Sequence, residues 1–156
     1  MANLSQYGII KGEGRYHQEI VYTTALLYNL ASQKIEEYLS GFNLTLGKLN
    51  ILIAVKHQGK EEGLSQVELS QHLILTPSNM TKMIDKLEKE GLVTRSAMNG
   101  DRRVNIVKIT TKASKLLDNL WDGFQATMME LVNKLEPGKQ KQLAGLLIDW
   151  SEKLTN

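Results

Sequence analysis

The spacing of apolar residues predicts a mainly helical chain that is interrupted once by strands. Between about residues 15 and 40, apolar side chains recur every three to four positions, which is the period of an amphipathic helix. Gly41 follows and predicts the end of that helix. A second helix is expected to begin after Thr45, a good N-cap residue, and to reach about His57.

Two further helix-start signals lie close together in the middle of the chain. Ser65 and Glu68 have the spacing of a capping box, which opens a short helix. Thr76 as N-cap and Pro77 as first helical residue open a longer helix, which should end at Gly91. The residues expected to face inward are Val67, Leu69 and Leu73 in the short helix and Met80, Met83, Ile84 and Leu87 in the longer one. Two helices joined by such a tight turn are typical of a helix-turn-helix.

The apolar pattern then changes from the helical period to the strand period of two. Residues 92–95 and 104–109 are expected to form two strands, and Asn99-Gly100 between them is a strong hairpin-turn signal. A hairpin directly after a helix-turn-helix corresponds to the wing of a winged helix.

Two helices close the chain. The first is capped by Thr110 or Thr111 and runs to about Leu135, and Pro137 separates it from the second. One face of the last helix carries a narrow apolar stripe, formed by Leu143, Leu146, Leu147, Trp150 and Leu154. This stripe either packs within the chain or forms a subunit interface, and the thin central core of the chain favours the interface.

The expected fold class is therefore mainly α: a winged helix-turn-helix with a small β-hairpin wing, flanked by N- and C-terminal dimerisation helices. We expect the winged part over about residues 45–112 of the 156-residue chain. The dimerisation part is expected over about residues 1–40 and 113–156.

Positive charge is concentrated in the predicted winged part. The whole chain has a formal net charge of only +2 at pH 7. Residues 76–115, however, hold nine basic and four acidic residues, a net charge of +5, so that the remainder of the chain carries −3. A cationic segment suits a polyanion, because lysine and arginine contacts to phosphate release counterions. A solvated charged helix face is the alternative.

The composition argues against several other classes of protein. Without cysteine, the chain has no disulfide, thiolate zinc site or thiol redox sensor. Its longest apolar run, residues 51–55, is far too short to span a bilayer, and no signal-peptide pattern is present, so we expect a cytoplasmic protein without membrane attachment. His17, His57 and His72 are scattered and form no zinc motif. We expect no catalytic residues, no metal and no cofactor.

The residues left exposed on the longer helix of the pair are suited to reading DNA. Ser78, Asn79, Thr81 and Lys82 remain near its start, with Lys86 one turn further on. Asparagine can pair with adenine through two bonds, lysine can reach guanine, and hydroxyl groups can bond to bases or phosphates. Because Ser, Asn and Thr also favour helix starts as capping residues, this pattern alone leaves a purely structural role open.

The expected tip of the wing adds two cationic residues. Arg102 and Arg103 follow the turn, and an arginine there can enter a narrow minor groove, where A·T tracts strengthen the negative potential. Asp101 is anionic and therefore a poor DNA contact. Its expected role is to hold Arg103 or Arg95 by bidentate pairing. A solvated tip with a weak surface ion pair is the alternative.

These motifs resemble the MarR family of transcriptional regulators. The likeness is carried by residues 83–95, Met-Ile-Asp-Lys-Leu-Glu-Lys-Glu-Gly-Leu-Val-Thr-Arg, and by Asp101-Arg102-Arg103-Val104 and Val107-Lys108-Ile109-Thr110. The family pattern there is a recognition helix, a Gly-Leu-Val-x-Arg strand, a wing with Asp-x-Arg, and the start of the next helix. The order of helices over about residues 16–154 agrees as well. Asn99 departs from the pattern where many members have proline, and Ala113 where glycine is common.

The resemblance implies a bacterial regulator that binds double-stranded DNA as a homodimer at a pseudo-palindromic operator, most simply as a repressor. The DNA-contact residues expected from the chain's own chemistry and from the resemblance are Ser78, Asn79, Thr81, Lys82, Lys86, Arg95, Asp101, Arg102 and Arg103. A winged-helix module that binds another protein without touching DNA is the alternative, and the clustered charge argues against it.

A small-molecule ligand is a separate question. Members of the family often bind small aromatic or phenolic anions in a cleft between the dimerisation arm and the winged domain. The residues that could line such a cleft here are Tyr16, Tyr22, Tyr28, Trp121 and Met128. Core or interface packing is the commoner role of such side chains, so the ligand-binding residues stay unassigned.

Overall fold

The computed structural model spans the chain and describes residues 4–10, 12, 14–60, 62–73, 77–98 and 101–155. Among these, the side chains of His72, Pro77, Ser78, Met98 and residues 101–104 are not described. The expected N-cap Thr76 and the hairpin turn Asn99-Gly100 lie outside the described residues. The chain divides into two compact units: the winged-helix unit, residues 36–122, and the terminal-helix unit, residues 1–35 and 123–156.

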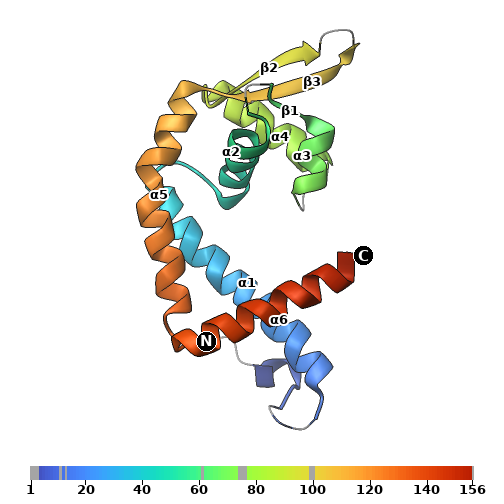
Figure 1. Cartoon of the computed structure of the whole chain (residues 1–156), viewed down its shortest axis with the longest axis vertical. Coiled ribbons are helices and arrows are strands. Elements are labelled where there is room, and N and C mark those ends of the chain that lie inside the picture. The colour runs from blue at the N-terminus through green and yellow to red at the C-terminus, as the bar shows by residue number, and fades with distance from the viewer. Residues whose placement is uncertain are drawn as a thin grey trace. The chain divides into compact units, whose positions relative to one another are not determined.

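The winged-helix unit contains the expected elements in the expected order (Figure 1). Its helices are α2 (Leu46–Gln58), α3 (Gln66–His72) and α4 (Pro77–Lys89), and its hairpin consists of β2 (Val93–Met98) and β3 (Asp101–Ile109). It also includes the end of α1 (Tyr16–Ser40) and the start of α5 (Thr111–Val132). The predicted fold class, a mainly helical winged helix-turn-helix with a small wing, is confirmed.

One strand was not predicted. The two-residue strand β1 (Leu64–Ser65) pairs with Val107 and Ile106 of β3, so that the sheet has three antiparallel strands in the order β1-β3-β2. The short strand ties the chain just before α3 to the base of the wing.

The helix starts follow the capping signals in the sequence. The Thr45 side chain accepts a bond from the backbone N–H of Lys48 at 3.3 Å. Ser65 and Glu68 form the complete capping box, with bonds of 3.2 Å and 2.8 Å in the two directions. Of the two candidates for the cap of α5, Thr110 is the one whose hydroxyl accepts a bond from a helical N–H. These caps satisfy backbone donors that a helix start leaves free.

The end of α4 is fixed by Gly91, which adopts a left-handed conformation with φ of +70°. The N–H of Leu92 donates to the carbonyl of Leu87 at 2.8 Å, and the N–H of Gly91 donates to that of Glu88 at 2.9 Å. This pair of bonds is a Schellman motif, which turns the chain directly from the helix into β2.

The core of the winged-helix unit lies where α2, α3 and α4 meet the sheet. Its fully buried side chains include Leu49, Ile51, Leu52, Leu69, Met80, Ile84, Leu87, Val93 and Val107. Val67 is an error of the sequence interpretation, since its side chain is 65% exposed rather than inward-facing. Val67 and Leu69 are two residues apart, and side chains at that spacing point to nearly opposite sides of a helix.

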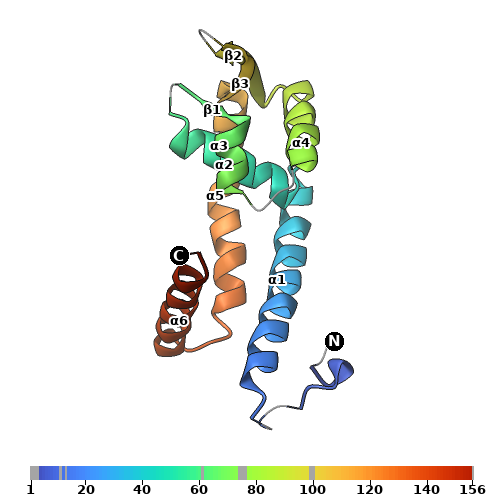
Figure 2. The same ribbon diagram turned by 90° about the vertical axis from the view of Figure 1, so that its right-hand side faces the viewer.

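The terminal-helix unit contains the 3₁₀ turn η1 (Leu4–Tyr7), most of α1, the end of α5, and α6 (Pro137–Thr155) (Figure 2). None of the residues of α6 is buried within the chain. Two helices of this unit carry large apolar side chains that are at least 40% exposed: Tyr16, Ile20, Val21, Tyr22, Leu27, Tyr28 and Leu30 on α1, and Leu143, Leu146, Leu147, Ile148 and Leu154 on α6. Over the described residues, no helix is both long and apolar enough to cross a membrane.

Candidate nucleic-acid interface

Helix α4 has an apolar side and a polar side. Met80, Ile84 and Leu87 are at most 2% exposed and pack into the core. The exposed residues are Asn79, Thr81, Lys82, Lys86 and Lys89. The polar side therefore presents amide, hydroxyl and ammonium groups to solvent. These groups can bond to base edges and to phosphates.

The structure brings several of the expected contact residues together on this helix. Asn79, Thr81, Lys82 and Lys86 lie exposed on α4, and Ser78 lies in its first turn, with its side chain outside the described part of the chain. Arg95 lies on β2, which packs directly against α4. Asp101, Arg102 and Arg103 begin β3, but only their backbone is described, so the structure leaves their expected contacts untested.

Arg95 has intramolecular partners that the sequence interpretation did not name. Its Nη1 lies 2.7 Å from Oδ1 of Asp85, and its Nε donates to Oε2 of Glu88 at 2.9 Å. The Arg95 Nη2 bonds to the same Glu88 oxygen, and the backbone N–H of Arg95 donates to Oε1 of Glu88 at 3.2 Å. Both acids lie on α4, so Arg95 connects β2, the first strand of the wing, to α4.

This cluster changes the acid–base properties of its members. The side-chain hydrogen bond from Arg95 is the main cause that lowers the pKa of Glu88 below its ordinary value. In return, the bond to Glu88, followed by that to Asp85, raises the pKa of Arg95. Both shifts favour the charged forms of Glu88 and Arg95.

The carboxyl end of α4 is held by a second set of contacts, which the sequence interpretation also missed. Lys48 of α2 is buried, with only 10% of its side chain exposed, and its Nζ lies 2.6 Å from Oε1 of Glu90. The Nζ of Lys112 donates to the backbone carbonyl of Glu90 at 2.7 Å, and the hydroxyl of Thr110 donates to the carbonyl of Gly91 at 2.9 Å. The end of the recognition helix is thus fixed from α2 and from the start of α5.

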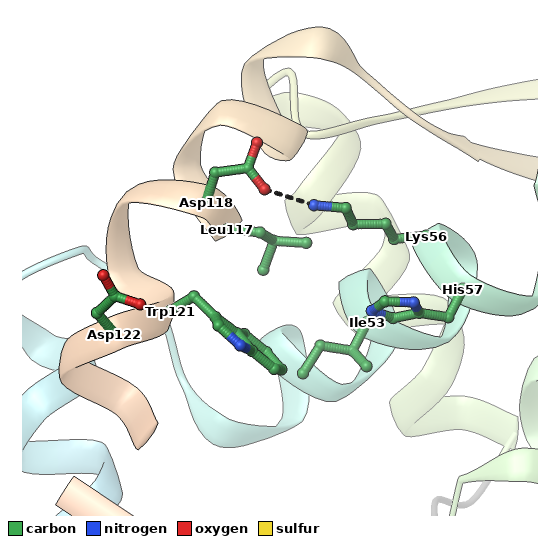
Figure 3. A pocket seen from close by; sticks show the side chains of 7 residues that line it. All are labelled: Ile53, Lys56, His57, Leu117, Asp118, Trp121 and Asp122. Atoms are coloured by element: carbon green, nitrogen blue, oxygen red, sulfur yellow. Dashed lines mark hydrogen bonds and ion pairs between the residues drawn. The ribbon is translucent and has the colours of Figure 1, made fainter. Parts of the chain in front are cut away.

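A cavity of about 330 Å³ lies between α2 and α5 within the winged-helix unit (Figure 3). It is lined by Ile53, Lys56, His57, Leu117, Asp118, Trp121 and Asp122. The Nζ of Lys56 and Oδ1 of Asp118 form an ion pair of 2.6 Å, which joins the two helices across it. Trp121, one of the cleft residues suggested from the sequence, does line this cavity.

No metal centre is evident in the part of the chain that the structure describes, because its histidine and acidic side chains form no group of three or more that could hold an ion. The lining of the cavity combines an indole ring, two aliphatic side chains and charged groups.

A helix-turn-helix followed directly by a β-hairpin, with a lysine-bearing polar face on the second helix, defines a winged helix-turn-helix protein. Residues 44–104 match the model of the MarR family, which confirms the resemblance found in the sequence. Over these residues the chain is similar to transcription regulators of the MarR family. This similarity agrees with the expectation of a regulator rather than an enzyme.

Individual relatives agree with this assignment. The HTH-type transcriptional repressor YetL of Bacillus subtilis (strain 168) is 25% identical over 121 residues, which cover 78% of this chain and 72% of YetL. A putative MarR-like transcription regulator from Bacillus cereus ATCC 10987 superposes with a TM-score of 0.80 at 19% identity, covering 90% of this chain and 99% of the other. A mutant MarR from E. coli, complexed with operator DNA, gives a TM-score of 0.76 at 23% identity over 84% and 92% of the two chains. At these identities the two structures establish the fold.

Proposed function

We propose that this protein binds operator DNA in a sequence-specific manner and represses transcription. The observation that carries the proposal is the polar face of α4, where Lys82, Lys86 and Lys89 are exposed beside Asn79 and Thr81. A recognition helix of this kind enters the major groove with its N-terminal residues at the base edges. The related YetL is named a repressor, and a regulator bound over a promoter blocks polymerase.

Different groups on this surface are given different tasks. We assign Asn79 to pair with adenine, and Ser78 and Thr81 to bond to bases or phosphates. Lys82 and Lys86 neutralise phosphate or reach guanine. On the wing, Arg102 and Arg103 are assigned to the backbone and the minor groove, with Asp101 holding Arg103 in position.

The proposed assembly is a two-fold homodimer formed by the terminal-helix unit. Its support is the large exposed apolar surface of α1 and α6, which includes Tyr28, 67% exposed, and Leu146, 62% exposed. An accumulation of exposed large apolar side chains favours an association site. A two-fold dimer presents two recognition helices to half-sites about one helical turn apart, which matches a pseudo-palindromic operator. Such a regulator works in the cytoplasm, where its DNA lies.

We further propose that a small aromatic or phenolic ligand releases the protein from DNA. The support is the cavity between α2 and α5, in which Trp121 offers an aromatic face and Lys56 a cationic group. The same helix α2 holds the end of the recognition helix through Lys48. A ligand that displaces α5 from α2 would therefore act close to the DNA-binding surface.

Salt titration of binding to duplex DNA tests the central proposal. Fluorescence anisotropy with a random duplex should show affinity that falls steeply with salt, because phosphate contacts release counterions. Lys82→Ala should weaken binding and reduce the slope of log K against log salt by about 0.9 if Lys82 contacts one phosphate. Lys153→Ala is the matched control, since Lys153 is an exposed lysine on α6, 71% exposed and paired with Asp149.

The outcomes are distinct. Binding to neither random nor selected duplexes at low salt would refute the proposal and favour a protein-binding module. Equal affinity and equal slope for Lys82→Ala and Lys153→Ala would remove α4 from the interface. If the protein binds duplex DNA, selection of bound sites from random DNA would define the operator and show whether it is pseudo-palindromic.

A further inference from the structure

The DNA-facing side of α4 contains an anionic residue that a phosphate-binding surface has to accommodate. Asp85 follows Lys82 by three residues and precedes Lys89 by four, so it lies beside both lysines on the helix surface. Its side chain is 43% exposed, and that of Glu88, three residues further on, is 37% exposed. Two uncompensated carboxylates here would repel a phosphate track and cancel much of the charge of the lysines.

Arg95, on the neighbouring strand, bonds to both carboxylates and offsets one of their two negative charges. All three guanidinium nitrogens of Arg95 take part, one toward Asp85 and two toward Glu88. Two of these nitrogens share one Glu88 oxygen, and charge-assisted hydrogen bonds of this kind are among the stronger polar contacts. Only 26% of the Arg95 side chain is exposed, and its donors point at the helix rather than outward.

We infer that Arg95 is a positioning residue that enables α4 to approach DNA by offsetting one of the two negative charges of Asp85 and Glu88 and by fixing β2 to the helix, and that Arg95 does not itself touch DNA. This inference rests on the proposed DNA-binding function. It replaces the direct contact expected for Arg95 from the sequence with an indirect role, and it gives Asp85 and Glu88 a function in setting the charge and the geometry of the surface.

Removing one acid together with the arginine tests this role. Arg95→Met keeps most of the volume of the side chain and removes its charge, so DNA affinity should fall by roughly tenfold, the loss expected from one uncompensated charge near phosphate. The double variant Arg95→Met, Glu88→Gln restores the net charge that the three residues carry in the wild type. Its affinity should return to within about threefold of the wild type, which is close to the spread of ordinary surface substitutions.

A direct contact by Arg95 predicts the opposite result. The double variant would then bind as weakly as Arg95→Met, and its salt slope would be smaller than that of the wild type by about 0.9 for a lost phosphate contact. Either result would overturn the inference. Arg103→Met is the matched control, because the loss of a wing arginine expected to enter the minor groove should not be rescued by Glu88→Gln.

A measurement without DNA separates the inference from the proposed function. In the free protein, a double-mutant cycle measured by thermal unfolding should show coupling between Arg95 and Glu88; the cycle compares the wild type, Arg95→Met, Glu88→Gln and the double variant. Amide hydrogen exchange at Arg95 should also become faster when Glu88 is replaced. Additive effects with unchanged exchange would overturn the pairing itself. If wild type fails to bind duplex DNA while this coupling is present, the proposed function fails and the pairing stands.

Discussion

Gly63 lies immediately before β1, where the chain passes under the base of the wing. Its φ of +83° is a left-handed conformation that residues with a Cβ rarely adopt. A Cβ added there would lie 2.6 Å from the backbone oxygen of Val107 and 2.8 Å from the side chains of Ile106 and Lys108, all on β3. Because the Val107 oxygen belongs to the sheet backbone, it cannot move without moving the strand. Gly63→Ala therefore combines conformational strain with crowding.

Two other glycines separate these effects. Gly91 has φ of +70° and no atom within 4 Å of an added Cβ, so Gly91→Ala measures the strain alone, about 1–2 kcal/mol. Gly59 has φ of −74°, and an added Cβ would lie 2.7 Å from the Val55 carbonyl oxygen, so Gly59→Ala measures crowding alone, about 1–3 kcal/mol. If the two effects add, Gly63→Ala should destabilise the protein by about 2–5 kcal/mol.

Urea unfolding followed by circular dichroism measures all three variants under one set of conditions. The midpoint should shift with little change in the slope m, because the surface exposed on unfolding stays nearly the same. DNA affinity of Gly63→Ala, measured where the protein is folded, should also fall, since the displaced strand carries the wing. Equal destabilisation by Gly63→Ala and Gly91→Ala would show that the chain does not approach β3 as closely as described.

Two further predictions concern ion pairs around α4. Glu90→Ala leaves the buried ammonium of Lys48 without its partner and should lower the free energy of unfolding by about 2 kcal/mol or more. Lys48→Met leaves a Glu90 side chain that is 32% exposed, so it should lower the free energy of unfolding by less. Urea unfolding measures both variants, and the reverse order would contradict this expectation. The lowered pKa of Glu88 stabilises the fold fully at pH values above the ordinary carboxyl value of 4.5, and this contribution is lost as the pH falls through the lower folded-state value. The stability difference between wild type and Arg95→Met should thus be constant near neutral pH and shrink in acid, and a difference that grows in acid would contradict the assignment.

The sequence predicted best where a local rule determines the structure. Caps such as Thr45 and the Ser65–Glu68 box act within one turn, and Gly91 is required by its own φ, so each could be recognised without knowing the rest of the chain. The strand β1 could not be recognised, because two residues show no periodicity and their pairing with β3 joins positions some forty residues apart.

In the candidate site, too, the features set by a local pattern were predicted and those set by packing between distant segments were not. The exposed residues of α4 followed from helical periodicity, since removing the inward positions leaves the outward ones. The partners of Arg95 and the burial of Lys48 depend on which elements pack against α4, and no pattern within a single segment contains that information. An arginine four residues beyond the helix-ending glycine, following two acids on the helix, was the signal that could have suggested the Arg95 cluster.

The exposed apolar surface of α6 has a consequence for the thermodynamics of folding. A 19-residue helix with no buried residue gains little from packing within its own chain, although such packing supplies most of the stability of helices in proteins. In the proposed dimer, the free energy that keeps α6 helical comes from association and therefore follows mass action. The melting temperature of this protein should then rise with its concentration, so that dilution alone would weaken the segment that pairs the two subunits before it weakens the winged helix.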